Sequence, residues 1–369
     1  MSKHTVALLG LGVRGKTHLK ALLANSNYFE VVGLCDIDAE KMKEVAASNN
    51  LDVPLFTDGE EMLKVTKPEV FVFVTYPNIR LSMIQLAVKY GVKAISLEKP
   101  MAESLKEARE MRDLCLANNI KAVVCHQQKY LSQMLAMKRK LDSGILGKII
   151  KIHVETQPWL AQLGTHYVDY AIWANGGYKA KWVVGHVHGP ATLADNHPSP
   201  DYMLGEIGFE NGTRAYIECG YLSEQHNPEM YCDTDNRITV YCENGYVYAE
   251  TDGFWGECSP NTGGKLVTGK EPGWYNHQEK QIQTPYYTEY GKWLDNDSCK
   301  HSCNIETAYH GYEILEGICI SALDNTRIDL PIQSVDYKPV IERMQHELPE
   351  CGTYLRPLYD GKEPRQERD

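Results

Sequence analysis

Short apolar runs alternate with amphipathic stretches over residues 5–126 of the chain. The runs TVALLG, EVVGLCD, VFVFVTYP, AISLEKP and KAVVCHQ have the length of buried strands, and a weaker run lies near VPLF. The stretches between them, such as AEKMKEVAASNN, IRLSMIQLAVKYG and ESLKEAREMRDLCLANN, carry apolar residues at helical spacing. This alternation predicts an α/β domain with a doubly wound parallel sheet and crossover helices.

The pattern changes after residue 122. A predicted helix over residues 132–143 is followed by the strand-like runs IIKIHVETQ, WVVGHVHG, LGEIGFENGTRAYIECGY and RITVYCENGYVYAE. Two of these runs contain Asn-Gly, which is a strong signal for a β-hairpin. Helices are also expected at THYVDYAIWAN and IETAYHGYEILEGICISALDN. This part is therefore predicted to be an α+β domain with a large open, mostly antiparallel sheet.

These patterns predict three segments. Residues 1–122 form a Rossmann domain, residues 123–335 a domain for substrate binding and oligomerisation, and residues 336–369 a C-terminal arm or partly disordered tail, because they are rich in Pro, Glu and Arg. An open sheet leaves a face that needs cover, so a homo-oligomer (dimer, tetramer or higher) is expected.

The charge balance excludes some partners. The 369 residues carry a formal net charge of −11. Nucleic acids and anionic membrane surfaces reward clustered Lys and Arg, so neither is expected as a partner. The N-terminal MSKHTVALLG lacks the layout of a secretory signal, and no apolar stretch approaches the ~20 residues that span a bilayer, so a cytoplasmic location is expected.

The cysteine and histidine groupings are weak metal signals. Eleven cysteines without a repeating framework indicate free thiols in a reducing compartment. Cys299, His301 and Cys303 form the tightest group, but zinc sites usually bring a second ligand pair, which is missing here. His186 and His188 share one face of a predicted strand and are interpreted as ordinary sheet histidines, with metal binding as the minority interpretation. No metal site is predicted.

A glycine loop, LLGLGVRGKTH, follows the first predicted strand and precedes a helix. A plain turn could contain the same glycines, but this position favours a dinucleotide site. Gly10 permits the tight turn, Gly12 lets the backbone approach a pyrophosphate, and Gly15 allows close packing of helix on strand. Asp36 ends the second strand, where a carboxylate accepts hydrogen bonds from a ribose 2′-hydroxyl and repels a 2′-phosphate. Asp38 adds negative charge, so NAD is predicted over NADP.

A lysine follows a later strand. LEKPM places Glu98, Lys99 and Pro100 at the carboxyl end of the strand AISL, and open α/β sheets bind ligands beyond these ends. A lysine there could bind a substrate hydroxyl and stabilise the alkoxide that develops as hydride leaves. A solvated surface lysine is the alternative, because Lys is rarely buried.

The motifs GLGVRG, TYPN, EKPM, SGILGKI and GTHYVDYAIW occur in this order, and their spacing resembles the Gfo/Idh/MocA oxidoreductase family over residues 4–333. The resemblance implies a Rossmann domain, a C-terminal domain with an open sheet, and oxidation or reduction of a secondary alcohol on a sugar, inositol or related polyol. It also implies that Lys99 contacts both substrate and nicotinamide ribose. The residues expected to bind the cofactor are Gly10, Gly12, Val13, Arg14, Gly15, Asp36, Thr75, Pro77, Glu98 and Lys99.

A histidine completes the expected catalytic pair. Many members of the family carry Asp-x-x-x-His on the first helix of the second domain, where the His transfers the proton. Here His166 matches the histidine, whereas Gln162 stands at the aspartate position and cannot ionise. Asp169 lies three residues from His166 and could orient it, but packing or binding within the domain is the favoured interpretation. The residues expected to line the substrate are His126, Gln128, Trp159, Gln162 and His166.

The sequence thus predicts an NAD-dependent dehydrogenase in which Lys99 and His166 flank a secondary hydroxyl of a sugar, glycoside or cyclitol. Either of the two could take the proton. Gln162 and the unusual CHQQKY segment favour oxidation of glucose or a glucoside at C3, which gives a 3-keto sugar. Two alternatives remain: a glycoside-cleaving enzyme that oxidises, eliminates and reduces with NAD permanently bound, and a regulator that senses dinucleotide without catalysis.

Overall fold

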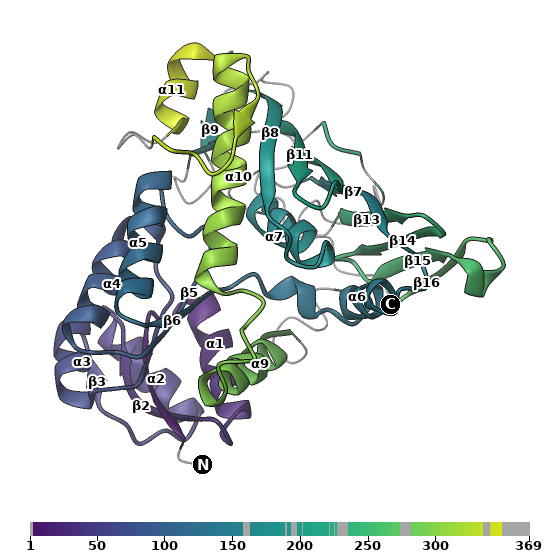
Figure 1. The fold of residues 1–369 in the computed structure, drawn as a ribbon. Helices are drawn as coiled ribbons and strands as arrows, with labels where there is room; N and C mark the ends of the chain where they lie inside the picture. The colour runs from purple at the N-terminus through teal and green to yellow at the C-terminus, as the bar shows by residue number, and fades with distance from the viewer. Residues whose placement is uncertain are drawn as a thin grey trace. The chain divides into compact units, whose positions relative to one another are not determined.

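The computed structural model describes residues 3–157, 163–188, 190–192, 198–200, 202–220, 222–224, 226, 235–273, 282–334 and 340–348. The chain divides into two compact units (Figure 1). The first comprises Met1–Tyr130 and Gln278–Tyr309, and the second comprises Leu131–His277 and His310–Asp369. No helix within the described ranges is long and apolar enough to cross a membrane.

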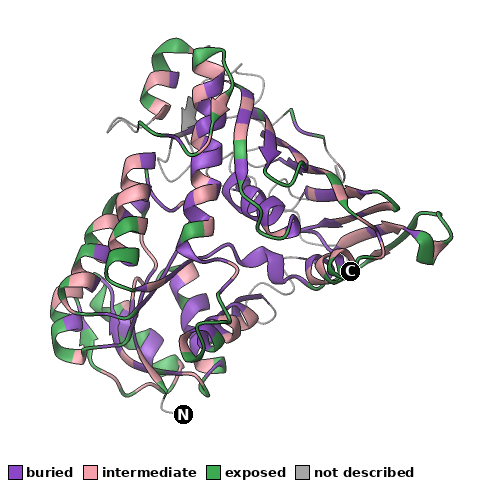
Figure 2. Ribbon diagram, in the orientation of Figure 1, coloured by how far each residue is buried: buried purple, intermediate pink, exposed green. Residues whose placement is uncertain are grey.

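Six parallel strands form the sheet of the first unit, in the order β3-β2-β1-β4-β5-β6. They are β1 (His4–Leu9), β2 (Phe29–Cys35), β3 (Leu55–Phe56), β4 (Val70–Phe73), β5 (Ala94–Leu97) and β6 (Lys121–Val124). Strands β4 and β5 are buried along their whole length (Figure 2), as expected for a parallel sheet covered by helices on both faces. The strand order reverses at β1, which confirms the predicted doubly wound fold.

The helices of the first unit are α1 (Val13–Ala24), α2 (Ala39–Ser48), α3 (Gly59–Thr66), η1 (Pro77–Ile79), α4 (Arg80–Lys89), α5 (Leu105–Ala117), η2 (Gln127–Tyr130) and α9 (Gln283–Asp295). Most of them connect these strands, whereas η2 and α9 follow the last strand. Helix α9 comes from the far end of the chain and packs against α1 (Figure 1). The sequence patterns predict neither α3 nor α9.

Nine strands form the main sheet of the second unit, in the order β16-β15-β14-β13-β7-β12-β11-β8-β17. They are β7 (Ile149–Thr156), β8 (Ala180–Val187), β11 (Tyr202–Phe209), β12 (Arg214–Gly220), β13 (Asn236–Cys242), β14 (Gly245–Glu250), β15 (Phe254–Cys258), β16 (Val267–Lys270) and β17 (Ile328–Asp329). Only β7 and β12 pair in parallel, so the predicted mostly antiparallel sheet is confirmed. The hairpins predicted at Asn211-Gly212 and Asn244-Gly245 join β11 to β12 and β13 to β14.

One face of this sheet carries the core of the second unit. Gly185 and Gly205 bring the sheet close to Ile318 of α10 (Ile305–Asp324), since a Cβ on either glycine would come within 2.5 Å of the Ile318 side chain. Helix α7 (Thr165–Ala174) also contacts β7, β12 and β13. The remaining elements are α6 (Ser132–Asp142), η5 (Pro260–Thr262), α11 (Val340–Glu347) and the two-stranded sheet of β9 (Pro190–Thr192) and β10 (Pro198–Pro200).

Helix α11 lies where an arm or disordered tail is expected. Its Met344 is 1% exposed, and its Arg343 pairs with Asp324 of α10 at 2.9 Å. The composition of the whole segment, rich in Pro, Glu and Arg, conceals the short apolar stripe that allows these eight residues to pack as a helix.

Candidate functional site

The glycine loop lies at the carboxyl end of β1. Gly10 has φ +88°, and a Cβ there would lie 2.3 Å from the carbonyl oxygen of Val74, so only glycine fits. A Cβ on Gly15 would lie 1.9 Å from the carbonyl oxygen of Gly10. The close packing of α1 on the loop therefore also requires glycine at this position. A Cβ on Gly12 would meet nothing within 4 Å among the described residues. The loop therefore leaves an open position in front of the first turn of α1.

The first turn of α1 is suited to an anion. Gly12 is its N-cap and supplies no side-chain cap, and the first turn contains no acidic residue. Its N–H groups and the positive end of the helix dipole therefore face the open position. Val13, in this turn, is 85% exposed.

Asp36 follows β2 and lies against the glycine loop. Its Oδ2 accepts the N–H of Leu11 at 2.6 Å and lies 3.2 Å from the Lys41 ammonium, while its Oδ1 accepts the N–H of Asp38 at 3.1 Å. Burial alone would raise the pKa of Asp36, but these N–H groups and the ammonium outweigh it and lower the pKa below its usual value. The carboxylate is thus ionised at neutral pH, as the predicted ribose ligand must be.

Glu98 is a buried anion beside Lys99. It is 6% exposed, and its Oε1 accepts Arg14 Nε at 3.1 Å and lies 3.0 Å from His18 Nε2. Burial would raise the pKa of Glu98, but Arg14, His18 and Lys99 outweigh it and hold the pKa well below the usual value. Its Oε2 accepts the backbone N–H of Lys99 at 3.3 Å. The ion pair therefore anchors the turn that carries the predicted catalytic lysine.

Arg14 turns inward from the glycine loop. Besides Glu98, it donates from Nη2 to the side-chain oxygen of Gln283 in α9 at 2.9 Å. Its Nη1 is buried without a hydrogen-bond partner in the described part of the chain. The structure thus gives Arg14 a structural role, and its predicted contact with the cofactor stays a prediction.

Thr75 and Pro77 follow β4, next to the glycine loop in the sheet. Arg80, which is 2% exposed, donates to the carbonyl oxygens of both Thr75 and Pro100. Arg80 therefore joins the TYPN and EKPM segments. The sequence patterns do not reveal this role, and the only signal is an arginine at the start of a predicted amphipathic helix. The Thr75 hydroxyl is buried and has no partner among the described residues.

These features together fit a dinucleotide. The open position before α1 suits a pyrophosphate, the ionised Asp36 suits a ribose hydroxyl, and the Thr75 hydroxyl provides an unused hydrogen-bonding group at the same sheet edge. All three lie at the carboxyl ends of parallel strands, where this class of sheet binds its ligands.

His18 connects the Glu98 ion pair to α9. It is fully buried, and its Nδ1 lies 2.6 Å from the hydroxyl of Tyr287. The amide of Gln283 also donates to the thiol of Cys125 at 3.4 Å. Burial raises the pKa of Cys125 well above its usual value, so the thiol stays protonated. The sequence patterns point to neither His18 nor α9 as part of the site, because their partners are at least 80 residues away in sequence.

Acidification is expected to destabilise the protein through His18. Burial lowers the pKa of His18 from 6.5 and outweighs the attraction of Glu98. Near the pKa of His18, the folded chain therefore binds fewer protons than the unfolded chain. The contribution of neutral His18 to the free energy of unfolding is complete above the pKa of the unfolded chain, and it is lost as the pH falls toward the lower pKa of the folded chain. We expect the free energy of unfolding to fall less between about pH 7.5 and about pH 5.5 in His18→Gln than in the wild type.

Denaturant unfolding at both pH values measures this difference. His186→Gln, at an exposed position on β8, is the matched control and should keep the wild-type pH dependence. Equal losses of stability in His18→Gln and the wild type would show that His18 does not carry the effect.

His126 and Gln128 belong to the first unit rather than to the start of the second. His126 is 4% exposed and directly precedes η2, and Gln128 is 3% exposed and lies in η2. The backbone oxygen of His126 accepts the thiol of Cys303 at 3.6 Å. Their predicted role in lining the substrate stays a prediction.

His166 is the second residue of α7, whose N-cap is Gly164, and it is 2% exposed. Its Nδ1 lies 3.0 Å from the hydroxyl of Tyr170, one helical turn further on. Asp169 is fully buried on the same helix. Tyr170 is thus an orienting partner that sequence reasoning missed, although its spacing of four residues was available as a signal. Trp159 and Gln162, also predicted for this site, lie outside the described residues.

Two family models match the sequence. The model described as "Oxidoreductase family, NAD-binding Rossmann fold" matches residues 4–126, and the Gfo/Idh/MocA C-terminal domain matches residues 134–248. An inositol 2-dehydrogenase of Burkholderia cenocepacia is 23% identical over 62% of this chain and 70% of its own length. An oxidoreductase of Schizosaccharomyces pombe is 25% identical, and the match spans about half of its length (52%).

Solved structures share the fold. The WlbA dehydrogenase of Bordetella pertussis, crystallised with NADH and UDP-GlcNAcA, superposes with a TM-score of 0.69 at 21% identity, over 90% of this chain and 100% of its own. The transcriptional regulator Gal80p of Kluyveromyces lactis superposes with a TM-score of 0.73 at 13% identity, over 89% and 94% of the two chains. The matched domains and the geometry of the glycine loop agree: this chain belongs to the Gfo/Idh/MocA family of oxidoreductases, and its first unit contains the NAD-binding Rossmann fold of that family.

Proposed function

We propose that the protein is an NAD-dependent dehydrogenase that oxidises a secondary hydroxyl of a sugar, glycoside or cyclitol. The observation that carries this proposal is the anchored turn at Glu98 and Lys99. It lies at the same edge of the sheet as the glycine loop and Asp36, so a lysine stands where the cofactor is expected. A protein that only binds dinucleotide needs the loop and the aspartate but not this lysine.

In the proposed reaction, His166 accepts the hydroxyl proton and Lys99 stabilises the oxyanion that develops. The opposite assignment, with Lys99 as the base, uses the same residues. The Tyr170 hydroxyl, 3.0 Å from His166 Nδ1, supports His166 as the base, because a hydrogen bond at one ring nitrogen fixes the orientation of the imidazole. Bound NAD supplies the hydride acceptor.

The substrate class rests on the relatives. The similar proteins include an inositol 2-dehydrogenase and a dehydrogenase crystallised with NADH and UDP-GlcNAcA. Within this class we favour C3 of glucose or a glucoside, because Gln162 replaces the usual aspartate and the CHQQKY segment departs from the usual pocket sequence.

Two other functions use the same fold. A glycoside-cleaving enzyme would oxidise, eliminate and reduce with NAD retained, and a regulator would bind dinucleotide without turnover. The likeness to Gal80p keeps the regulator as a candidate. The presence of both Lys99 and His166 favours an enzyme, since a regulator has no use for an acid–base pair.

The absorbance band of reduced nicotinamide tests the proposal. The purified protein is mixed with NAD or NADP, and then with glucose, glucosides, galactose and inositols in turn. We expect the band to rise with NAD and one class of sugar. Bound dinucleotide without any net change, together with released free sugar, would indicate the glycoside-cleaving enzyme. Bound dinucleotide without any product would indicate the regulator.

A further inference from the structure

A group of histidines and glutamates lies on the second unit, on the sheet face opposite its core. We call it the His–Glu cluster, and it consists of His153, Glu155, Glu218 and His226. Side chains alternate between the two faces of a strand, and Ile152 and Val154 of β7 are buried in the core. The His–Glu cluster therefore projects from the other face of the sheet.

Three segments bring the cluster together. Strand β7 supplies His153 and Glu155, and the parallel strand β12 places Glu218 in register with Glu155. The candidate ligand atoms of these three residues all lie within 4.8 Å of one another. His226, from the segment after β12, lies with its Nε2 3.0 Å from Glu155 Oε2.

The spacing suits a four-coordinate metal ion. Zinc binds His nitrogen and carboxylate oxygen at about 2.0–2.2 Å, so neighbouring ligand atoms of a tetrahedron lie about 3.3–3.6 Å apart. Glu155 Oε2 lies 3.0 Å from His226 Nε2 and 3.9 Å from His153 Nδ1, on either side of this range. Small side-chain rotations would bring these atoms to coordination distance.

The charges favour a cation. Carboxylates on adjacent strands repel each other, and Glu155 is only 5% exposed. Nearby cations have other partners, because Arg237 bonds to Glu250.

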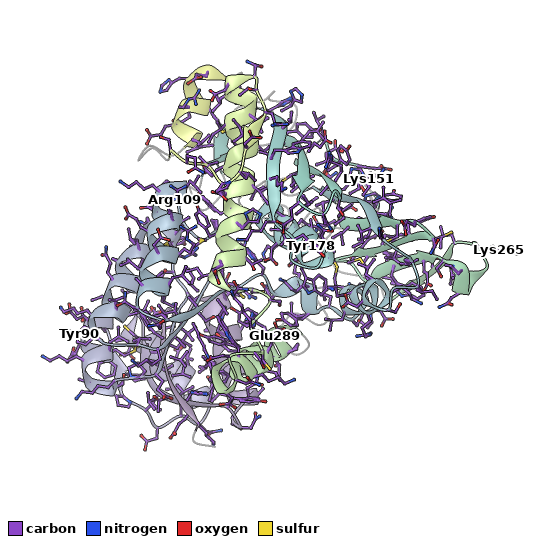
Figure 3. The ribbon with its side chains drawn as sticks, in the orientation of Figure 1. Tyr90, Arg109, Lys151, Tyr178, Lys265 and Glu289 are labelled. Carbon is purple, nitrogen blue, oxygen red and sulfur yellow. The ribbon has the colours of Figure 1, made fainter. Side chains whose placement is uncertain are left out.

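The ammonium of the neighbouring Lys151 contacts an aromatic ring outside the His–Glu cluster. Lys151, labelled in Figure 3, lies two residues before His153 in β7, so the alternation of side chains along a strand places both on one face. Its ammonium lies over the ring of Tyr241, 4.3 Å from the ring centroid, in a cation–π interaction. The Tyr202 hydroxyl donates to Glu218 Oε1 at 2.8 Å, and among the described residues no hydrogen bond is made to the second oxygen of that carboxylate.

The first unit provides a useful contrast. His18, Glu98 and Cys125 also place their candidate ligand atoms within 4.8 Å of one another. There, however, the Arg14 guanidinium already pairs with Glu98. That cation occupies the place of a metal ion, whereas the ion pairs of Glu155 with described residues are to His226 and His153, and Arg237, opposite Glu155 in the sheet, bonds to Glu250.

We propose that the His–Glu cluster binds a divalent transition-metal ion of the zinc class. Two nitrogen and two oxygen donors suit zinc, and the two carboxylates balance its charge. The ion would join β7, β12 and the segment that carries His226, and so would stabilise this part of the second unit. The sequence did not predict it, because the spacing of the four ligands matches no metal motif.

Zinc uptake by the full-length, metal-free protein tests the proposal. Chelator-treated protein is titrated with Zn²⁺ alone, followed by calorimetry and by metal analysis after desalting. We expect about one equivalent per chain at the cluster and a rise in Tm on binding. Glu218→Gln and His226→Gln should each lose this equivalent and the rise in Tm. His186→Gln, an exposed histidine on β8, should keep both.

Cobalt distinguishes the cluster from the cysteines. The wild-type Co²⁺ complex should show the visible bands of nitrogen and oxygen ligands without a near-ultraviolet thiolate band. The proposal is overturned if the wild type takes up no Zn²⁺, if the two cluster variants keep the bound equivalent, or if the wild-type spectrum shows thiolate ligation. The wild-type Co²⁺ spectrum tests the predicted nitrogen and oxygen ligands even if a variant fails to fold.

Discussion

Replacing Lys99 by Ala should lower kcat by about 10²–10³-fold or more while NAD still binds, because the variant loses the group that stabilises the developing oxyanion. The glycine loop and Asp36 do not depend on the Lys99 side chain, and their hydrogen bonds to the backbone remain. Initial rates with the sugar identified by the absorbance assay measure the loss in kcat. Titration with NADH, followed by its fluorescence, measures binding.

The matched control is Lys93→Ala. Lys93 is an exposed lysine that precedes β5, whereas Lys99 follows it, so the two variants remove the same charge at opposite ends of one strand. Lys93→Ala should retain wild-type kcat. Full activity in Lys99→Ala would remove the basis of the whole catalytic assignment.

Replacing Glu98 by Gln should destabilise the protein by about 3–5 kcal/mol, because it removes one partner of a buried ion pair. Glu98 is 6% exposed and accepts from Arg14 and His18, so the variant leaves the arginine without its counter-charge. Urea unfolding at neutral pH measures the change in the free energy of unfolding.

A surface pair provides the comparison. Glu110 pairs with Lys106 on α5 at 3.8 Å and is 44% exposed, so Glu110→Gln should cost no more than about 1 kcal/mol. Removing both charges in Arg14→Gln/Glu98→Gln should restore part of the stability that Glu98→Gln loses. A loss in Glu98→Gln that is no larger than in Glu110→Gln would show that the ion pair is not a stabilising element.

The site residues of the first unit could be predicted from the sequence where their roles depend on neighbouring residues in the chain. Gly10, Gly15 and Asp36 are recognisable because a strand, a tight turn and a helix follow each other within one stretch of chain. The same holds for Lys99, which ends a predicted strand. Arg80 was not recognised, because its role depends on the carbonyl oxygens of two separate loops.

Long-range packing explains the other omissions. Helix α9 follows strands β7 to β16 in sequence, yet it packs against α1 and supplies Gln283 and Tyr287 to the groups around Glu98. No periodicity in residues 283–295 reveals this return to the first unit. Helix α3 was missed for a simpler reason, since it is only eight residues long.

The sequence by itself determined the two fold classes, the hairpins and the dinucleotide loop, because each follows from hydrophobic periodicity or turn chemistry within a short segment. Only the tertiary structure decided which residues bind the Glu98 carboxylate and which hydroxyl contacts His166. It also decided that two strands and a later segment bring the His–Glu cluster together. These contacts join groups that are distant in sequence, or are selected by side-chain packing, and a local pattern carries no information about either.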